Sequence, residues 1–306
     1  MASDMAGYVI ITPAHNEEAF IAKTAESVIA QSVRPLKWIV VNDASTDKTA
    51  EIIVRYSAQH SFIELVNLER RPGRHFGNKV SAFNRGLVKV KEVGYDYIGN
   101  LDADISLEYD YYESVLREFH KDQKLGIAGG IVYTKVGDNF ITYDKTLDSI
   151  GGAVQLFRRG CFQEIGGYIS LPYGGIDAAA EITARMKGWR VRKFTSLKVL
   201  EHRRTGSAQS GPLRAKVREG QRMYSLGYGW LFYILRCVFR VRDQPFIIGS
   251  IALLFGYMDS LLRRRPVVLS EEVVAYLKAE QNQRLKKLPA TLLGLERSSG
   301  EMDPII

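Results

Sequence analysis

The 306-residue chain has few cysteines, no sustained repeats and only one long apolar run. Its two cysteines, Cys161 and Cys237, lack the spacing of a metal site, and a chain of this length needs no single disulfide to hold its core. No basic segment followed by an apolar one precedes Tyr8, so we expect no export signal. The scarcity of cysteine argues against a disulfide-stapled secreted scaffold and predicts a reducing, cytoplasmic setting.

Composition and charge are those of a folded protein with one basic region. Apolar residues make up 46% of the chain and charged residues 25%, which argues against disorder. The net charge is +8, and the stretch 185–242 holds 15 lysines and arginines against two acids. Such a stretch could face nucleic acid, an anionic membrane surface or phosphorylated substrates, or it could be a solvated basic face.

Short apolar runs alternate with segments of helical periodicity. We expect strands at 8–12, 38–41, 63–68 and 97–101, with Pro13 ending the first, and helices at 17–31, 48–58 and 79–93. Further helices are expected at 108–121, 160–165 and 177–187, and strands at 125–133 and 151–157. Alternation of this kind predicts an α/β fold with a doubly wound, mostly parallel sheet.

Two aspartates separated by one alanine follow the fourth apolar run. In an extended backbone Asp102 and Asp104 project to one face while Ala103 turns away. Two close carboxylates repel each other unless a cation lies between them, and hard oxygen ligands suit Mg²⁺ or Mn²⁺. The motif alone is weak, because loops also use aspartate for turns and helix caps.

Polar residues also follow the first two strands, at 13–17 and 42–47. Open α/β sheets bind their ligands outside the carboxyl ends of the strands. The three strand ends therefore predict a site of nucleotide size at one edge of the sheet.

Five segments, ITPAHNEE, IVVNDASTDKT, NKVSAFNRGL, LDAD and GGIDAAAEITARMKGW, occur in an order and at separations that resemble the family 2 glycosyltransferases of the GT-A fold. The resemblance covers about residues 8–206 and implies a nucleotide-sugar site. Its implied members are Pro13, Asn16, Glu17, Asp43, Lys79, Asn84, Asp102, Ala103, Asp104, Arg203 and Arg204. It further implies that Asp102, Asp104 and His202 bind the metal and that Asp177 is the catalytic base.

Two positions depart from the family pattern. Asn42 stands where the family often has an aspartate, and Ile176 stands where a glutamate usually precedes the catalytic aspartate. Asp177 could alternatively be the N-cap of its helix, and His202 could be a histidine satisfied by its own surroundings. Glu181 is a second candidate carboxylate, although helical spacing could simply pair it with Arg185.

The chemistry of glycosyl transfer calls for the same residue types. A sugar leaves a nucleoside diphosphate when the charge growing on the leaving oxygen is neutralised, which a divalent ion and nearby arginines can do. The acceptor hydroxyl becomes a good nucleophile when a base takes its proton, and this is the role expected of Asp177. Attack opposite the leaving group inverts the anomeric centre.

The C-terminal part has a different character. Residues 245–262 form an apolar run of 18 residues, and Arg263, Arg264 and Arg265 follow directly. Three interpretations are open: a buried packing helix, a helix lying in the plane of a membrane surface, and a marginal transmembrane span. We expect a GT-A nucleotide-sugar-binding catalytic domain over 1–210 and a helical, membrane-associated region over 211–306.

These observations predict a metal-dependent inverting glycosyltransferase of the hexosyltransferase type at the cytoplasmic face of the cell membrane. It would move a sugar from a UDP- or GDP-sugar to a saccharide or polyprenyl-linked acceptor in cell-surface polysaccharide or glycolipid synthesis, with no nucleic-acid partner. The enzyme alternative is a nucleotidyltransferase, which would want a glycine-rich basic loop where residues 15–18 are acidic. The other is a basic nucleic-acid-binding protein, which would have no need of the aspartate pair.

Overall fold

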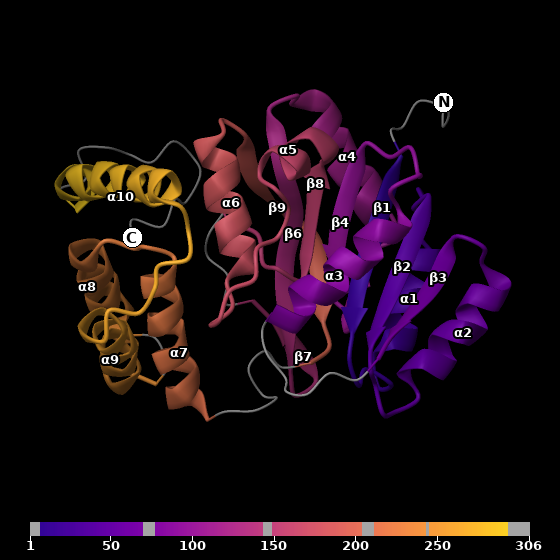
Figure 1. Ribbon diagram of the computed structural model, residues 1–306, viewed down its shortest axis with the longest axis horizontal. Coiled ribbons are helices and arrows are strands. Elements are labelled where there is room, and N and C mark those ends of the chain that lie inside the picture. The colour runs from indigo at the N-terminus through magenta and orange to yellow at the C-terminus, as the bar shows by residue number, and fades with distance from the viewer. Residues whose placement is uncertain (1–6, 70–76, 143–148, 204–210, 243–244, 293–306) are drawn as a thin grey trace. The chain divides into compact units, whose positions relative to one another are not determined.

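The computed structural model describes residues 7–69, 77–142, 149–203, 211–242 and 245–292. The chain divides into two compact units (Figure 1). The first comprises residues up to 170 together with 176–204, and the second comprises 171–175 together with 205 to the end. The boundary expected at residue 210 lies outside the described residues, so the division into domains at that point stays a prediction.

The first unit is built on one sheet. Its strands are β1 (Tyr8–Ala14), β2 (Lys37–Asp43), β3 (Ile63–Leu68), β4 (Tyr97–Leu101), β5 (Ile105–Leu107), β6 (Leu125–Val136), β7 (Asn139–Ile141), β8 (Val154–Arg158) and β9 (Arg190–Glu201). They lie in the order β3-β2-β1-β4-β8-β6-β9-β5, and β7 pairs with β6. The β1–β2, β1–β4, β2–β3 and β6–β9 pairs are parallel, and the other pairs are antiparallel.

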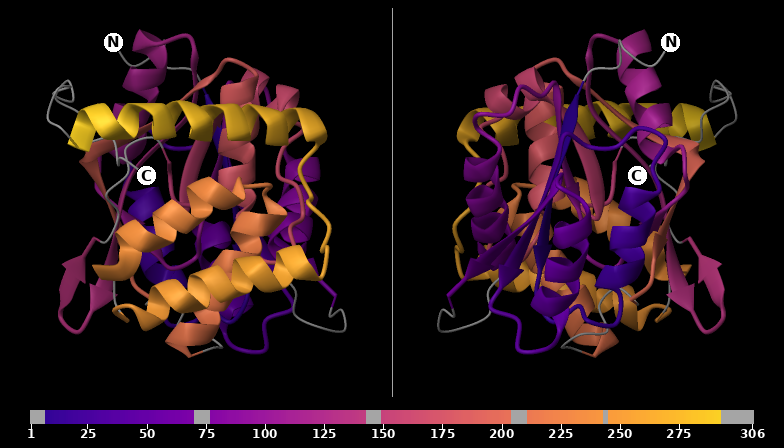
Figure 2. Two further views of the ribbon diagram at one scale, coloured as in Figure 1. Left: turned by 90° about the vertical axis from the view of Figure 1, so that its left-hand side faces the viewer. Right: turned by 90° about the vertical axis from the view of Figure 1, so that its right-hand side faces the viewer.

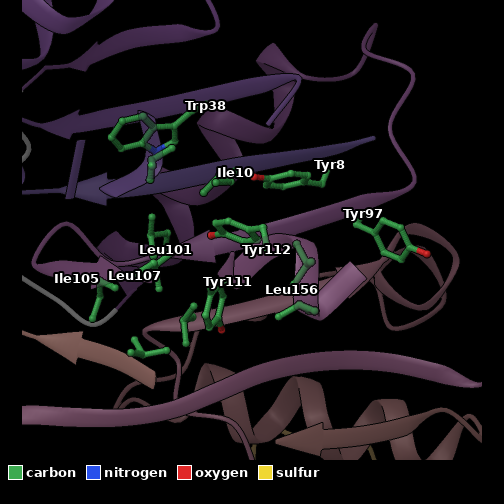
Figure 3. Packing of buried hydrophobic residues seen from close by; sticks show 14 of the residues in the cluster. Tyr8, Ile10, Trp38, Tyr97, Leu101, Ile105, Leu107, Tyr111, Tyr112 and Leu156 are labelled. Carbon is green, nitrogen blue, oxygen red and sulfur yellow. The ribbon is translucent and has the colours of Figure 1, made fainter. Parts of the chain in front are cut away.

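Helices cover both faces of this sheet because the central strands are apolar on both sides. Along β1, Tyr8 and Ile10 face one core while Val9 and Ile11 face the other. The first core is closed by α1 (Ile21–Ile29), α2 (Thr49–Gln59) and α4 (Tyr111–Lys121), and Figure 3 shows Trp38 and Tyr112 packed within it. The second is closed by α3 (Gly77–Lys89), α5 (Arg159–Glu164) and α6 (Ile176–Met186). The doubly wound α/β fold is confirmed.

Three expectations about elements were wrong. Pro13 does not end the first strand, since it pairs in register with Val41. The strand tolerates proline because β1 pairs with β4 only as far as Ile11, which leaves an edge beyond that point. The first helix begins at Ile21 rather than at residue 17. The 12-residue strand β9 was not expected, because Lys193 is buried and the register shifts between Phe194 and Lys198, so its buried residues do not keep a period of two.

The second unit is helical in the part that the structure describes. It contains α7 (Pro212–Ser225), α8 (Trp230–Phe239), a 3₁₀ turn (Arg240–Arg242), α9 (Ile248–Leu262) and the long α10 (Glu271–Leu292), seen in yellow in Figure 2. Among the helices of the described residues, none combines the length and apolar content that crossing a bilayer requires. The interpretation of residues 245–262 as a transmembrane span is therefore not supported.

Candidate functional site

The loops that follow β1 and β2 hold each other in place. The backbone N–H of Asn16 donates to Ser45 Oγ at 3.0 Å, and the side-chain oxygen of Asn16 accepts from the Thr46 N–H at 2.8 Å. The Glu17 N–H donates to Thr49 Oγ1 at 2.7 Å. Asn16 itself has a φ of 55°, a left-handed conformation that asparagine tolerates better than most residues. Two of the predicted strand ends therefore form one fixed rim.

Asn42 is part of this rim for a structural reason. It is 6% exposed, donates to Asn67 Oδ1 at 2.8 Å and accepts from the Ser45 N–H at 3.1 Å. An aspartate could not donate to Asn67, so the amide suits the site where the family often has a carboxylate. The next residue, Asp43, is half-buried at the end of β2, and its carbonyl lies 2.6 Å from Nδ1 of His15.

The aspartate pair lies in a turn between β4 and β5. Residues 102–104 are therefore not extended as expected, because the chain turns directly after Leu101. The side chain of Ala103 is nevertheless buried in the first core, and the Ala103 carbonyl accepts from Thr24 Oγ1 at 2.8 Å. The side chains of Asp102 and Asp104 remain 29% and 14% exposed. The turn buries the alanine and leaves both carboxylates accessible at the edge of the sheet.

Negative charge is crowded at this edge. Burial raises the pKa of Asp104 to about 7, and repulsion from Asp102 and Glu201 adds to the shift while Arg203 opposes it. Burial likewise raises the pKa of Glu17 to about 7; Arg203 opposes that shift, and the charges of both aspartates add to it. The carboxyl groups in the loops that follow β1 and β4 therefore form one electrostatic cluster.

Two cations of the chain itself partly compensate the cluster. Arg203 donates to the Glu17 carboxylate, and its Nε lies 3.8 Å from Asp104 Oδ2. Lys79 Nζ lies 2.5 Å from Asp102 Oδ1. The predicted residues Glu17, Lys79 and Arg203 are thus brought to the aspartate pair, whereas Arg204 lies outside the described residues.

His202 lies beside the aspartate pair, but among the described residues its side chain is not grouped with the two carboxylates in a way that could hold a metal. Its backbone N–H donates to the Asp104 carbonyl at 2.9 Å, while its Nε2 lies 2.7 Å from Ser106 Oγ. The ring stacks on Phe20 and meets Phe140 edge-on. Burial and two nearby lysines lower its pKa, which favours neutral imidazole. Its role as a metal ligand stays a prediction.

The carboxylate oxygens of the aspartate pair suit a cation whose remaining ligands come from the substrate and water. Within the described residues, no group of three or more histidine, cysteine, aspartate or glutamate side chains is arranged to hold a metal. Mg²⁺ commonly binds through one or two carboxylates together with substrate phosphates and water. Asp102 and Asp104 offer such oxygens, and their mutual repulsion is what a bound cation relieves.

Asp177 is connected to this cluster through a single glycine. Its Oδ2 accepts from the Gly152 N–H at 3.1 Å. The Gly152 carbonyl accepts from Asn100 Nδ2 at 2.6 Å and from Lys79 Nζ at 3.3 Å, and Asn100 Nδ2 also reaches Asp102 Oδ1 at 3.1 Å. Helix α6 begins one residue before Asp177, so this side chain stands inside the first turn and bonds outside its helix. The N-cap alternative is not supported.

Two of these connecting residues were not among the predicted site residues. Asn100 is 2% exposed and is the one polar side chain within β4, a signal that could have marked it. Gly152 belongs to a glycine pair, and a Cβ built on it would lie 3.1 Å from Asp177 Oδ2. A side chain at position 152 would therefore press on the Asp177 carboxylate, which would have to move aside by a few tenths of an ångström.

Glu181 supports the same segment from within the protein. Its Oε1 accepts from the Ile150 N–H and from Gln155 Nε2, both at 2.8 Å. Gln155 in turn accepts from the Tyr168 hydroxyl at 2.7 Å. Burial, with the charge of Asp177, raises the pKa of Glu181 to about 8. Glu181 is 2% exposed, so its carboxylate does not face solvent. It instead holds the segment that leads into β8, next to Gly152.

Two predicted residues are not drawn into these contacts. Asn84 is exposed on α3, five residues beyond Lys79, and the helix turns about 100° per residue, so the two side chains leave different sides. Pro13 is half-buried within β1. Their contacts with a nucleotide stay predictions.

Residues 9–171 match the family model described as glycosyl transferase family 2. Among curated proteins, the chain is similar to the poly-beta-1,6-N-acetyl-D-glucosamine synthase of Staphylococcus aureus (strain COL), with 24% identity over 208 residues, 62% of this chain and 48% of that protein. The synthase of the same name from Staphylococcus epidermidis is 32% identical over 124 residues, 40% of this chain and 28% of that protein. The chain thus spans about half the length or less of these relatives.

Solved structures share the fold. The mannosyltransferase PcManGT from Pyrobaculum calidifontis, in complex with GDP-Man and Mn²⁺, superposes with a TM-score of 0.55 at 16% identity, covering 95% of this chain and 84% of that one. Residues 1–349 of S. aureus TarS, in complex with UDP-GlcNAc, superpose with a TM-score of 0.54 at 13% identity, covering 94% and 87%.

Proposed function

Because the chain belongs to glycosyl transferase family 2, we propose that it is a metal-dependent inverting glycosyltransferase that uses a UDP- or GDP-sugar. The observation that carries the proposal is the chain of hydrogen bonds from Asp177 through Gly152 to Lys79 and Asn100, and from both of these to Asp102. It holds a candidate base and a candidate diphosphate site in fixed relation. Family membership argues against the nucleotidyltransferase and nucleic-acid-binding alternatives.

The donor nucleotide is assigned to the rim formed by the loops after β1 and β2. Asp43 faces the base or ribose, and Pro13, Asn16 and Glu17 line the pocket. Hydrogen bonds hold the two loops of the rim together before any ligand binds, so less conformational entropy is lost on binding. The solved structures described above hold GDP-Man or UDP-GlcNAc, and they support a nucleotide-sugar donor for this chain.

Asp102 and Asp104 are the residues that would hold Mg²⁺ or Mn²⁺, with His202 as a further candidate ligand. A divalent ion, when bound there, supplies positive charge against the departing diphosphate. Lys79 and Arg203 add positive charge at the same edge, since each already lies against one of the site carboxylates. The neighbour crystallised with GDP-Man and Mn²⁺ supports this assignment.

Asp177 takes the proton of the acceptor hydroxyl. The Gly152 N–H fixes one carboxylate oxygen, so the other is left to face the acceptor. Attack from this side, opposite the leaving diphosphate, inverts the anomeric centre. Lys79 and Asn100 hold the Gly152 carbonyl and thereby set the position of the base relative to Asp102.

The acceptor is a saccharide or a lipid-linked saccharide, in the synthesis of a cell-surface polysaccharide or glycolipid. The curated relatives named as polysaccharide synthases support this class of product. We assign the reaction to the cytoplasmic face of the cell membrane, with peripheral contact through the second unit.

The first test is thermal unfolding of the protein with UDP, GDP and their sugars, with and without Mn²⁺. We expect one base to raise the unfolding temperature only when Mn²⁺ is present, because the metal couples the diphosphate to the aspartate pair. Asp102→Asn should abolish that shift. Equal shifts with and without metal would contradict the metal assignment, and no shift with any nucleotide would contradict the donor assignment.

The second test is Asp177→Asn. It should lower kcat by a factor of about 10² to 10⁴ because the general base is lost, while the metal-dependent nucleotide shift stays unchanged. Asp110→Asn, on an exposed aspartate at the start of α4, is the matched control and should keep full activity. Activity of Asp177→Asn equal to that of the control would remove Asp177 from the chemistry.

A further inference from the structure

Helix α9 exposes several of its large apolar side chains. Ile248, Ile251, Phe255 and Leu262 are 58%, 62%, 62% and 77% exposed. Their spacing of three, four and seven residues places them in one stripe along the helix, which we call the outer face of α9. The stripe continues before the helix, where Phe246 and Ile247 are also exposed.

The opposite face of α9 is made largely of small residues. Gly249, Ser250, Gly256 and Ser260 are buried, together with the larger Leu253 and Tyr257. A Cβ built on Gly256 would lie 2.0 Å from the carbonyl oxygen of Val217 on α7. From the other side, a Cβ on Gly220 of α7 would lie 2.1 Å from the Leu253 carbonyl oxygen. The backbones of α7 and α9 therefore touch, and glycine is required at their crossing.

In its exposed stripe and its glycine contacts, this distribution differs from that in a helix packed on a water-soluble core. There the large apolar residues face inward and polar residues face the solvent. Helices that pack within lipid instead place small residues at the helix–helix contact, and their large apolar side chains face the acyl chains. The second unit follows the lipid pattern in the α7–α9 pair.

Charged residues on α9 are confined to its C-terminal end. No charged residue occurs from Pro245 to Met258. Asp259, the first one, lies 2.6 Å from Arg263 Nε and 2.8 Å from an Arg265 nitrogen, so its charge is compensated. Arg263 and Arg264 are exposed at the end of the helix. An uncharged apolar stripe that ends in exposed arginines complements a surface with an apolar interior and anionic headgroups.

Helix α8 lies beside α9 and also exposes apolar side chains. The Tyr233 and Tyr257 rings stack at 4.6 Å and join the two helices. Trp230 and Val238 of α8 are each 60% exposed. Tryptophan is enriched where membrane and water meet, because its ring is apolar with one polar edge.

We propose that the outer face of α9 lies in the plane of an anionic lipid bilayer, with Ile248, Ile251 and Phe255 below the headgroups and Arg263 and Arg264 at the lipid phosphates. This deepens the membrane contact proposed above and is independent of sugar transfer, because binding to vesicles involves neither donor nor acceptor. A second copy of the chain would bring an identical arginine cluster to this face, whereas anionic headgroups bring the opposite charge.

Flotation of the full chain with vesicles tests the proposal. We expect strong flotation when about a third of the phosphatidylcholine is replaced by phosphatidylglycerol, and much weaker flotation with phosphatidylcholine alone. The double variant Ile251→Ser, Phe255→Ser should reduce the fraction bound by about tenfold or more, because two apolar side chains are lost from the buried stripe. The matched control is Val54→Ser, Val88→Ser, two valines of the first unit that are 53% and 56% exposed.

A depth measurement separates insertion from adsorption by charge alone. In a Phe255→Trp variant, tryptophan fluorescence should shift to the blue on vesicle addition and be quenched by lipids brominated on their acyl chains. Unchanged fluorescence with full flotation would overturn insertion of the outer face. Equal flotation of the double serine variant and the valine control would overturn it too.

The oligomeric state of the protein tests the competing possibility that a second copy of the chain covers the outer face of α9. Sedimentation of the wild type and the double serine variant without vesicles should give the same mass. A wild-type dimer that the serine substitutions dissociate would assign the outer face to a second copy and overturn the proposal. Circular dichroism of each variant confirms that the exposed substitutions leave the helices folded.

Discussion

The two units differ in the residues that they place at their closest backbone contacts and in the apolar residues that they leave outside. In the sheet unit, Trp38 and Ile10 are fully buried, and polar groups gather where strands end. In the helical unit, α9 packs Gly256 against the backbone of α7, buries Leu253 and Tyr257 as well, and leaves Ile251 and Phe255 outside. The apolar content of a segment therefore does not say which of its faces is inside. The contacts of the small residues decide it, because they fix where a neighbouring backbone passes.

The largest effect expected from this comparison is in the core of the sheet unit. Ile10→Ala should lower the free energy of unfolding by about 2–5 kcal/mol, because the side chain is fully buried and leaves a cavity. Ile251→Ala removes the same atoms from an exposed site and should change it by no more than about 0.5 kcal/mol. Chemical denaturation of both variants measures the difference. A similar cost at both positions would break the comparison.

The next effect is in the helical unit, where adding a side chain at a glycine contact, rather than removing one from a core, should lower stability. Gly256→Leu should destabilise the α7–α9 pair by about 1–3 kcal/mol or more, because the added side chain meets the Val217 backbone, which cannot move aside without shifting α7. Ala252→Leu adds three carbons, against four for Gly256→Leu, at a half-exposed position on the same helix and should be nearly neutral. Urea unfolding followed by circular dichroism tests the pair, and equal costs would refute the close helix crossing.

A smaller effect concerns pH and lies in the sheet unit. The pKa of Glu181 is raised from 4.5 to about 8. Below about pH 4.5 both folded and unfolded states hold this proton. Between about pH 4.5 and 8 the unfolded chain releases it first, so stability falls as the pH rises. Glu181→Gln should remove this loss, because its amide oxygen still accepts the two hydrogen bonds and cannot ionise.

Thermal unfolding at about pH 5 and about pH 8.5 measures this effect. The wild type should lose several degrees more than Glu181→Gln between the two values. Glu92→Gln, on an exposed glutamate, should follow the wild type. Parallel curves for all three proteins would show that the pKa of Glu181 is the same in the folded and unfolded states, which would contradict the prediction.

Local patterns predicted the frame, because a strand buried on both faces leaves an uninterrupted apolar run such as that of β1. They also placed α6 to within one residue at each end, and Gly188 follows it with a φ of 87°, the left-handed conformation that commonly ends a helix. Strand β9 was not predicted, because the buried Lys193 and the register shift that follows Phe194 interrupt the alternation of buried and exposed residues. Contacts such as Gly152 with Asp177 could not be predicted, because they depend on the antiparallel insertion of β8 beside β4, which no local pattern encodes.

The contact between Arg203 and Glu17 joins residues 186 positions apart. On the ribosome, the acidic ends of β1 and β4 emerge long before the guanidinium that tempers their repulsion. A chain released before β9 is complete would carry Glu17, Asp102 and Asp104 without Arg203, and would also lack the strand that holds β5 through Ile105 and Glu201. Premature termination within the last third of the sheet unit is thus expected to yield a fragment with its acidic edge exposed and self-repelling.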